Sequence, residues 1–464
     1  MRSLRLILFL VLVLGSVSCA AITRLATPGA EPIAGVTAVI KQVTATRTPL
    51  PLQTSTPEPT RTHPATSTIS PTPTLTLTPT IPPTPSELQL QVFEDLWNVV
   101  NEEYLYDDFN GVDWEEVYVE YREKVLAGMT NEQFNLTMDE MIGLLGDEHS
   151  IFLSPEDTKT SQAEFEGRYD YAGIGVLTQV VAERNLVTII LVFPTSPAEQ
   201  AGLRPHDNIL KVDGKPILDE KGARTEMLRG PANSKVNLTV QRPGESPREI
   251  ELTRQVITSS LPVPYEVLTT AHGKRIGYIL LVSFNDVTIS NQFTNALHNL
   301  TAGGPLDGLI LDNRQNGGGA DMVMVDVLSN FTSGQVGYFV NRQEQRPLRI
   351  VGRDIAGSQE VPLVVLVGKD TVSFGEIFSG ILQDMDRAQL IGETTEGNVE
   401  ILWVYEFADE SSAWIAHDAF TPMNDPDSDW EKNGVVPDQV VPVNWDEVTL
   451  QTDPAIQAAL KYFE

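Results

Sequence analysis

The chain has a single cysteine in 464 residues, Cys19. An internal disulfide is therefore excluded, and so is a metal site built from cysteines. Basic residues are also scarce, since 32 Lys and Arg stand against 63 Asp and Glu and give a formal net charge of −31. This excess argues against nucleic acid and anionic membrane surfaces as partners. No lysine occurs between Lys369 and Lys432, which limits the bases available to any catalytic residue in that interval.

The single cysteine lies at the end of an export signal. Two arginines precede the apolar run 6–14, and the sequence GSVSC ends at Cys19, as at a signal cleavage point. The pattern resembles a bacterial lipoprotein signal, although Ser16 stands where such signals usually carry leucine. We predict a signal peptide over 1–19, lipidation of Cys19 and an extracytoplasmic protein anchored at the bacterial cell surface. Ordinary cleavage with secretion and an uncleaved anchor are the alternatives.

A linker and a helical segment follow. Residues 20–86 are predicted to be a disordered linker, because their Thr, Pro and Ser content from about residue 44 leaves too little apolar surface to fold. Residues 87–168 contain three segments with apolar residues at helical spacing, which predicts a helical N-terminal domain. The last of them leads into LLGDEHSIFLSP, where His149 lies in a polar loop. Taken alone, such a histidine is more often structural or exposed than functional.

Short strands and turns characterise residues 169–256. YAGIGV, PTSPAEQAGLRPHDNILKVDG, LRG and VNLTVQRPG follow one another there, and this ordered set resembles a PDZ domain. His206 departs from the family, whose turn normally has glycine at this position. The resemblance implies a loop whose backbone N–H groups bind the carboxylate of a peptide C-terminus while the peptide adds as a strand to the sheet. Its predicted binding residues are Ala172, Gly173, Ile174 and Gly175.

A serine marks the junction of a strand and a helix further along the chain. VPLVVLV is typical of a buried strand, and residues 374–384 change to helical spacing, with Ile377, Phe378, Ile381 and Leu382 on one face and Glu376 elsewhere. Ser373 stands at the turn between them. A helix N-terminus favours developing negative charge, which suits a nucleophile. Serine is equally a preferred helix cap, and without partners the cap is the simpler interpretation.

A glycine-rich loop supplies one such partner. The predicted strand GLILD leads into the loop 313–319, NRQNGGG, and then into a helix. Glycines after a strand let the backbone approach a ligand and leave its N–H groups unblocked. Phosphate binding is the rival interpretation, but the chain has no G-x-x-x-x-G-K-[ST] motif. Backbone donors to an oxyanion fit the loop better.

The ordered motifs together resemble the C-terminal processing peptidase and tricorn-core family of serine peptidases. LLGDEHSIFLSP, the PDZ-like segment, LDNRQNGGG, TVSFGEIFSGILQD and NGVVPDQVV carry this resemblance, which covers residues 88–464. It implies a multidomain α/β fold with a helical N-terminal part, a PDZ domain and, over 257–464, a peptidase core of crotonase-like or ClpP-like ββα units. It also implies Ser373 as the nucleophile, with an oxyanion hole formed by the backbone N–H groups of Phe374 and Gly318.

The activating base is where this chain departs from the family. C-terminal processing peptidases use a serine–lysine pair, and alignment through IGETTEGNVE puts Asn398 at the lysine position. Asparagine has no basic nitrogen. The tricorn-like branch instead uses a histidine before the PDZ region and a glutamate after the nucleophile, which implies His149 as base and Glu431 as its partner. Glu431 also reads as a solvated loop charge, and His417 is the runner-up base, although packing is its simpler role.

Three functions remain in view at this point. The first is an exported, tethered serine endopeptidase that binds polypeptide tails, mainly through their C-termini, and forms an acyl-enzyme at Ser373. The second is a peptide-binding relative in which Asn398 marks a lost active site, and the third is a ligand-binding relative without proteolysis. The retained serine, histidine, glutamate and glycine loop favour the endopeptidase. No cofactor, no metal site and no nucleic-acid partner is predicted.

Overall fold

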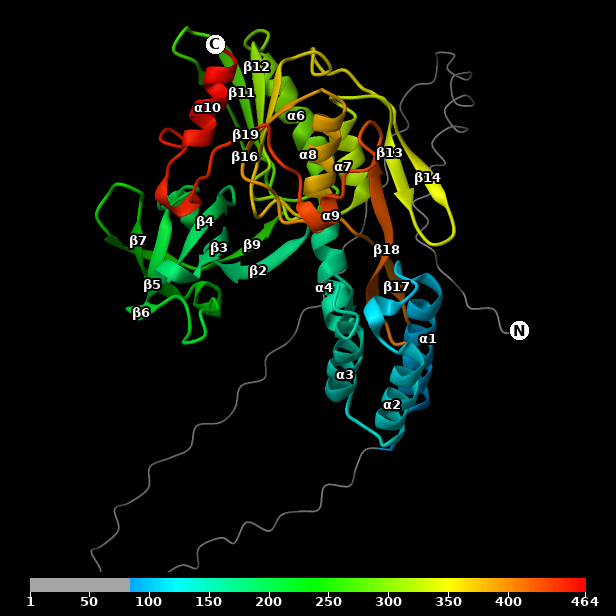
Figure 1. Ribbon diagram of the computed structural model, residues 1–464. Coiled ribbons are helices and arrows are strands. Elements are labelled where there is room, and N and C mark those ends of the chain that lie inside the picture. Colours follow the sequence, from blue (N-terminus) through cyan, green and yellow to red (C-terminus); the bar gives the residue numbers. More distant parts are fainter. Residues whose placement is uncertain (1–83, 148) are drawn as a thin grey trace, which may run out of the picture. The chain divides into compact units, whose positions relative to one another are not determined.

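The computed structural model describes residues 84–147 and 149–464 (Figure 1). The predicted signal peptide, its Cys19 and the linker up to residue 83 lie outside these residues. Within them, the multidomain α/β fold with a helical part, a β-rich part and a mixed core is confirmed. Buried apolar residues gather in three clusters, and the cluster of the mixed core also includes Ile190, Leu191 and Phe193 of the β-rich part.

Four α-helices make up the N-terminal part: α1 (Glu87–Glu103), α2 (Trp114–Leu126), α3 (Asn131–Gly143) and α4 (Pro155–Phe165). Each begins after a side chain that accepts a backbone N–H of the first turn, namely Ser86, Asp113, Thr130 and Ser154. These caps satisfy donors that a helix start leaves open. The apolar faces of α1, α2 and α3 pack with β17 (Ile401–Glu406) and β18 (Ser412–Pro422). The loop that carries His149 is thereby held near strands from the far end of the chain.

The β-rich part contains two antiparallel arrangements. The pair β2 (Tyr169–Gly173) and β9 (Gln255–Ser259) lies outside a sheet of order β3-β4-β5-β7-β8, in which β6 adds to β5. The bounds of that sheet are β3 (Val176–Val181), β4 (Leu186–Val192), β5 (Asn208–Val212), β6 (Lys215–Pro216), β7 (Lys235–Gln241) and β8 (Arg248–Thr253). The short helix α5 (Pro197–Gln200) follows β4. Alternating buried residues along β7 fill a separate core beneath the sheet.

His206 takes the left-handed backbone conformation, with φ of +72°, that explains why relatives prefer glycine there. Its buried ring stacks on Trp445 with centroids 4.0 Å apart, and its Nδ1 lies 2.8 Å from the Trp445 carbonyl oxygen. Asn208 donates to the carbonyl of Asp446 at 2.8 Å. The substitution therefore leaves the turn intact and gives it a contact with the C-terminal part of the chain.

The peptidase-like core is built on a sheet of order β10-β11-β12-β15-β16-β19. Its pairs are parallel except for β10 with β11. The strands are β10 (Tyr265–Thr269), β11 (Arg275–Leu280), β12 (Gly308–Asp312), β15 (Leu363–Val367), β16 (Gln389–Gly392) and β19 (Gln439–Val440). The helices α6 (Ile289–Thr301), α7 (Asp321–Leu328) and α8 (Phe374–Asp384) pack in sequence against one another, while α10 (Pro454–Tyr462) packs on β15 and β16 (Figure 1).

A second sheet connects the core to the helical part. Its path is β1-β18-β13-β14, and β17 pairs with β18. The strands of this sheet not yet introduced are β1 (Ile151–Leu153), β13 (Gly334–Val340) and β14 (Gln345–Ile350). The strand β1 follows the His149 loop directly and pairs antiparallel with the start of β18, where Ile151 faces Trp414. The long strand β18 therefore spans from the helical part to the core.

Two parallel strands deliver the predicted catalytic loops to one edge of the core sheet. The strands β12 and β15 are hydrogen-bonded neighbours that run in the same direction. Both are fully buried, as expected for continuous apolar runs. The glycine-rich loop follows β12 and the Ser373 turn follows β15, so both emerge at the carboxyl edge of the sheet, the usual site of ligand binding in such folds.

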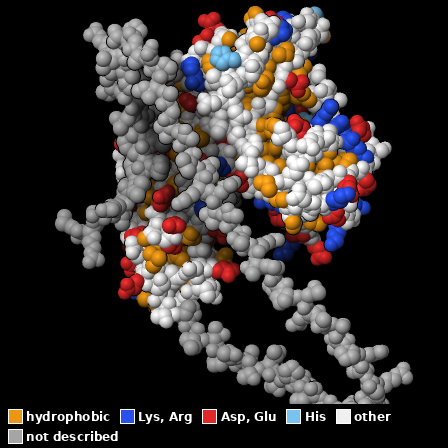
Figure 2. All heavy atoms as spheres, turned by 180° about the vertical axis from the view of Figure 1, so that it is seen from behind, with side chains coloured by type: hydrophobic (Ala, Val, Ile, Leu, Met, Phe, Trp, Pro, Cys, Tyr) orange, Lys and Arg blue, Asp and Glu red, His pale blue; other side chains and the backbone are white. Residues whose placement is uncertain are grey.

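Charged side chains are unevenly distributed over the face drawn in Figure 2. Lys and Arg side chains are mixed with Asp and Glu on the part at the right of this view, whereas acidic and apolar side chains predominate on the part at the lower left. Of the described residues, no helix is both long enough and apolar enough to cross a membrane.

The helix α8 is expected to depend on Phe378 for its position. This side chain is fully buried and packs on Phe284, with ring centroids 5.5 Å apart. Because its removal leaves a cavity in a close-packed core, Phe378→Ala should lower the free energy of unfolding by about 3–5 kcal/mol. Urea denaturation measures the change. Leu136→Ala, at a position 61% exposed, serves as the control and should change stability by no more than about 0.5 kcal/mol.

Candidate active site

Ser373 sits on a strained turn between β15 and α8. Its backbone has φ of +55° and ψ of −127°, a combination that costs a residue with a side chain on the order of 1–3 kcal/mol. The residue is partly exposed, whereas the helix that follows it is buried through Leu382. The predicted bounds of that helix, 374–384, are those of α8. Strain of this kind at a strand-to-helix turn is typical of a residue held for function.

The carboxylate of Glu376 holds this turn in place. It is fully buried and accepts hydrogen bonds from the backbone N–H groups of Ser373, Gly397 and Asn398, and from the Thr395 hydroxyl. Burial raises its pKa, against the lowering effect of these hydrogen bonds. The helical spacing predicts that Glu376 lies off the apolar face of α8. These hydrogen bonds explain how its carboxylate can nevertheless be buried. The carboxylate joins the Ser373 turn to the loop 395–398.

The glycine-rich loop lies against Ser373. A Cβ atom on Gly318 would stand 2.7 Å from the Ser373 Cβ, so only glycine fits there. Asn316 and Asn313 fasten the loop: Asn316 Oδ1 accepts the Gly318 N–H at 2.9 Å, and Asn313 donates to the Gly375 carbonyl at 2.8 Å. The Gly318 N–H, predicted as an oxyanion donor, therefore already has a partner that an oxyanion would have to share or displace. Phe374, the second predicted donor, opens the first turn of α8.

His149 and Glu431 meet across 282 positions of sequence. His149 Nε2 lies 3.2 Å from Glu431 Oε1, and the histidine side chain is only 7% exposed. The second oxygen of Glu431 accepts the backbone N–H groups of Val399 and Glu400 at 2.6 and 3.1 Å. Glu431 is the second residue of the short helix α9 (Trp430–Asn433), after the buried Trp430. It is thus fixed in place, which a solvated loop charge would not be.

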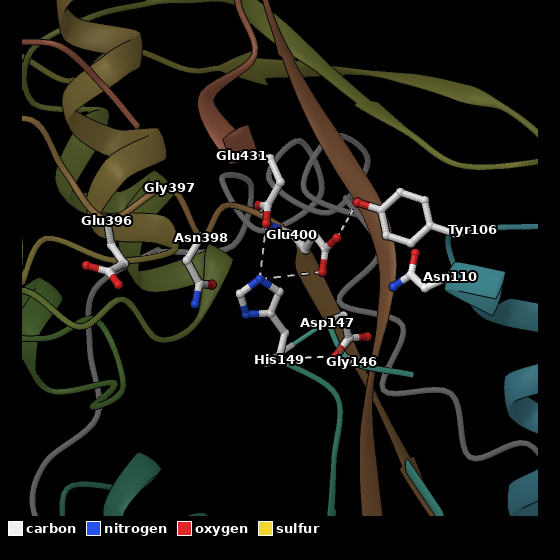
Figure 3. A pocket seen from close by; sticks show the side chains of 10 residues that line it. All are labelled: Tyr106, Asn110, Gly146, Asp147, His149, Glu396, Gly397, Asn398, Glu400 and Glu431. Atoms are coloured by element: carbon white, nitrogen blue, oxygen red, sulfur yellow. Dashed lines mark hydrogen bonds and ion pairs between the residues drawn. The ribbon is translucent and has the colours of Figure 1, made fainter. Parts of the chain in front are cut away.

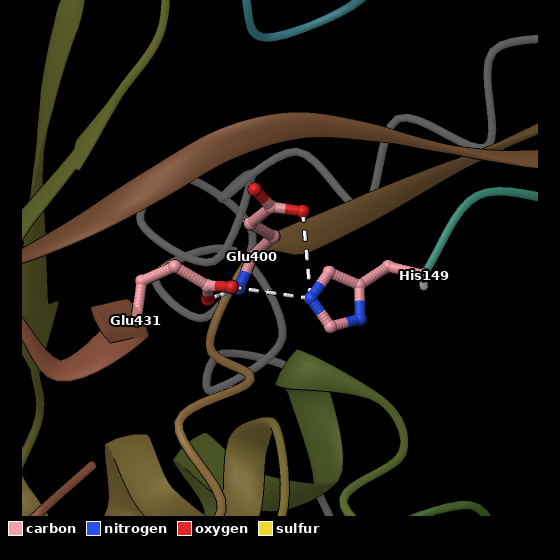
Figure 4. A group of neighbouring side chains, drawn as sticks. All are labelled: His149, Glu400 and Glu431. Carbon is pink, nitrogen blue, oxygen red and sulfur yellow. Dashed lines mark hydrogen bonds and ion pairs between the residues drawn. The ribbon is translucent and has the colours of Figure 1, made fainter. Parts of the chain in front are cut away.

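A second carboxylate, Glu400, completes the group and was not predicted. Its side chain is 3% exposed, and its Oε2 lies 3.6 Å from His149 Nε2 (Figures 3 and 4). The hydroxyl of Tyr106 donates to its other oxygen. Burial and, less strongly, the charge of Glu431 raise the pKa of Glu400 to about 7, while the Tyr106 hydrogen bond lowers it. The only available sequence signal was an acidic residue two positions after Asn398.

The two carboxylates determine which nitrogen of the His149 ring carries the proton. Burial lowers the pKa of His149, but Glu431 and Glu400 more than offset this effect, so the pKa lies above its ordinary value. A carboxylate accepts but cannot donate when ionised, so the neutral ring must carry its proton on Nε2. Nδ1 is then the basic nitrogen, and Figure 3 shows it turned away from both carboxylates.

Asn398 lies beside this group without entering it. The residue lines the same cavity of about 360 Å³ as His149, Glu400 and Glu431 (Figure 3). Its backbone carbonyl accepts the Ser373 N–H at 2.7 Å. Within residues 84–147 and 149–464, no hydrogen bond joins the Ser373 hydroxyl to the His149 ring. The runner-up base His417 lies elsewhere on β18, buried against Trp403 with Nε2 3.2 Å from Glu103, and fits the packing role.

Comparisons with known proteins show which family the chain belongs to. Residues 275–441 match peptidase family S41, residues 85–143 the tricorn protease C1 domain and residues 172–253 a PDZ domain. A carboxyl-terminal-processing protease of Synechocystis is 34% identical over 374 residues, which cover 78% of this chain and 84% of that protein. The chain belongs to the C-terminal processing peptidase family. It is a PDZ-containing serine peptidase.

Further relatives support the same assignment. A carboxyl-terminal-processing protease of Picosynechococcus is 32% identical over 375 residues, which cover 78% of this chain and 86% of that protein. The solved structure of a photosystem II D1 C-terminal processing protease has a TM-score of 0.53 and 26% identity, and the likeness covers 79% of this chain and 96% of that one. The fold of the peptidase is therefore that of its family.

The predicted peptide-binding loop of this peptidase borders a second cavity. Of the four predicted residues, Ile174 and Gly175 line this space of about 720 Å³. Ala172 and Gly173 belong to β2, where they pair with β9, and are not among its lining residues. Arg229 also lines the cavity, with its guanidinium carbon 5.0 Å from the centre of the Tyr171 ring.

Replacing Glu400 by glutamine should stabilise the peptidase at alkaline pH. With its pKa raised from 4.5 to about 7, Glu400 binds its proton more tightly in the folded state than in the unfolded chain. The free energy of unfolding therefore falls as the pH rises through this window, and the cost is complete above it. At about 1.4 kcal/mol per pKa unit, Glu400→Gln should gain up to about 3 kcal/mol at pH 8 and little at pH 4.5.

Urea denaturation of both proteins at the two pH values measures this difference. Glu406→Gln, at an exposed position on β17, is the matched control and should show no such dependence. A stability change of equal size at both pH values would contradict the role assigned to the buried charge.

Proposed function

We propose that this protein is an exported, membrane-tethered serine endopeptidase in which Ser373 is the nucleophile, His149 the general base and Glu431 the residue that orients it. The observation that carries the proposal is the contact between His149 Nε2 and Glu431 Oε1 at 3.2 Å. It unites residues from the helical part and from the end of the core, at the cavity that Asn398 also lines. The family lysine is absent there, and a histidine–carboxylate pair takes the place of the base.

The proposed reaction follows acyl-enzyme chemistry. His149 Nδ1 takes the Ser373 proton while the serine oxygen attacks the carbonyl carbon of the scissile bond. Backbone N–H groups at Phe374 and in the glycine loop stabilise the oxyanion. The histidine then returns the proton to the amine as the C–N bond breaks, and water hydrolyses the ester by the reverse sequence. Glu431 stabilises the imidazolium without taking its proton.

Closure of the site on substrate is part of the proposal. The Ser373 hydroxyl and the His149 ring share no hydrogen bond in the described residues, and catalytic hydrogen bonds often tighten only when substrate is bound. The His149 loop and the Ser373 turn belong to different parts of the chain, and the proposal requires one to move towards the other when substrate binds. In the same step, the Gly318 N–H would give up its hydrogen bond to Asn316 and donate to the oxyanion instead.

Substrates are proposed to be polypeptides with accessible C-termini. The matched relatives are named carboxyl-terminal-processing proteases, and a PDZ domain gives this chain a module for peptide tails. Arg229 beside the loop residues Ile174 and Gly175 supports binding of a carboxylate at this cavity. The strand β3 follows the loop directly and would receive the peptide as an added strand.

Membrane tethering and export rest on the N-terminal sequence alone. Lipidation of Cys19 would anchor the chain, and the Thr/Pro-rich segment would extend the peptidase away from the surface. If the lipid signal is not used, the same protein is secreted.

The proposal predicts how a fluorophosphonate probe, which reacts with activated serines, labels the purified full-length protein. Ser373→Ala should abolish labelling, and His149→Ala should lower its rate by at least about 100-fold, because a general base contributes that much or more. Asn398→Ala should stay within about tenfold of the wild type. Gel fluorescence against time measures the rates.

The matched control for His149→Ala is His298→Ala, at an exposed position on α6. Labelling of the His149→Ala protein at the wild-type rate would contradict the role of His149 as the base. An unlabelled wild type that still binds C-terminal peptides would favour the inactive peptide-binding relative instead.

The PDZ domain should distinguish a free peptide C-terminus from a blocked one. A fluorescent peptide with a free carboxylate should bind the Ser373→Ala protein at least about tenfold more tightly than the same peptide with a C-terminal amide, because backbone N–H groups bind the negative charge. Fluorescence anisotropy measures both affinities. Equal affinities would show that the PDZ domain does not recognise the terminal carboxylate of the peptide.

A further inference from the structure

Three potential metal ligands face one another within the proposed active site. The atoms are His149 Nε2, Glu400 Oε2 and Glu431 Oε1, and all lie within 4.8 Å of one another. Figure 4 shows both carboxylates directed at the same ring nitrogen. No metal site was predicted from the sequence, and Glu400 was not among the candidate residues.

The two distances from the histidine nitrogen are close to those around a tetrahedral zinc ion. Zinc bonds to imidazole nitrogen and carboxylate oxygen measure about 2.0–2.2 Å, so two ligands in a tetrahedron lie about 3.3–3.5 Å apart. From His149 Nε2, the two oxygens lie at 3.2 and 3.6 Å. The three ligand atoms lie within 4.8 Å of one another, so a cation could enter once the two carboxylates rotate towards it.

Each carboxylate is already oriented by its other oxygen. Tyr106 donates to Glu400 Oε1, and the N–H groups of Val399 and Glu400 donate to Glu431 Oε2. Outer hydrogen bonds of this kind typically orient the ligands of metal sites. The arrangement leaves one oxygen of each carboxylate directed at the histidine.

The Glu400 oxygen that faces the histidine has no hydrogen-bond partner in the described residues. Its side chain is only 3% exposed, and a buried carboxylate oxygen without a partner is costly. A bound cation would satisfy it and would offset the repulsion between the two neighbouring carboxylates. Glu400 thus points to a ligand independently of the spacing of the three atoms.

We propose that His149, Glu400 and Glu431 form a zinc-binding site, and that zinc bound there reversibly inhibits the peptidase. One imidazole and two carboxylates suit Zn²⁺ better than Mg²⁺ or Ca²⁺, which prefer oxygen ligands alone. Zinc on Nε2 leaves the ring proton on Nδ1. That nitrogen can then no longer accept the Ser373 proton, so inhibition, unlike binding, rests on the proposed function.

Zinc binding is tested on the full-length Ser373→Ala protein after removal of metals with a chelator. Isothermal titration with Zn²⁺ should give one site per chain, whereas Mg²⁺ should give none. Glu400→Gln and His149→Ala, each in the same background, should weaken binding at least about tenfold. Glu396→Gln is the matched control, because Glu396 lines the same cavity but is exposed and is not one of the three ligands.

Thermal unfolding shows whether a variant that fails to bind is still folded. Zinc should raise the melting temperature of the Ser373→Ala protein, since a ligand that binds the folded state stabilises it. The Glu400→Gln variant should melt cooperatively without that increase. Absence of a saturable zinc site, or binding that survives Glu400→Gln and fails with Glu396→Gln, would overturn the site.

Inhibition is tested on the wild type with the fluorophosphonate probe. Labelling should decrease over the zinc concentrations at which binding occurs and should return with EDTA. Zinc that binds without slowing labelling, or EDTA that abolishes labelling until zinc is restored, would overturn the inhibitory role. A metal-free wild type that is not labelled would instead contradict the proposed function, while the binding measurements would still stand.

Discussion

The rest of the site depends on the hydrogen bonds that the buried carboxylate of Glu376 accepts. The carboxylate fastens the strained Ser373 turn to the loop 395–398 through hydrogen bonds with backbone N–H groups. That loop leads directly into Val399 and Glu400, whose N–H groups hold Glu431. Glu431 in turn contacts His149. One carboxylate at the start of α8 therefore positions, step by step, a histidine that lies more than 200 residues earlier in the chain.

The second constraint is the crowding of negative charge around one histidine. Two carboxylates face Nε2, one of them almost fully buried. This environment keeps the ring proton on Nε2, directs the basic nitrogen away from the carboxylates and raises the pKa of the ring. The pKa of Glu400 is raised mainly by burial and, less strongly, by the charge of Glu431. The same atoms that would orient a general base also present the donor set of a cation site. If His149 serves as the base in place of the family lysine, as proposed, the site gains a metal ligand that a protonated ammonium group would not provide.

Much of the fold was predictable because its signals are local. The apolar run of β15, the change to helical spacing in α8 and the caps of the N-terminal helices each depend on residues close in sequence. Family motifs extended this to the PDZ domain and the peptidase core. Local signals do not show which distant elements share a core. The helices α1 to α3 pack with β17 and β18, a partnership that no periodicity reports.

The pairing of His149 with Glu431 was predictable only by analogy, and Glu400 escaped prediction altogether. Glu400 immediately precedes β17, at the point where the His149 loop, Tyr106 and α9 meet. The fold therefore buries it against the His149 ring.

The sequence by itself determined the strand–turn–helix at Ser373, the glycine loop, the absence of the family lysine and the membership of the family. Only the tertiary structure decided which ring nitrogen of His149 is basic, that Glu376 is buried, and that the Gly318 N–H is engaged by Asn316. The reason is physical. Side-chain periodicity and backbone preferences act over a few residues, whereas hydrogen bonding, burial and charge depend on atoms that the fold brings together from distant positions.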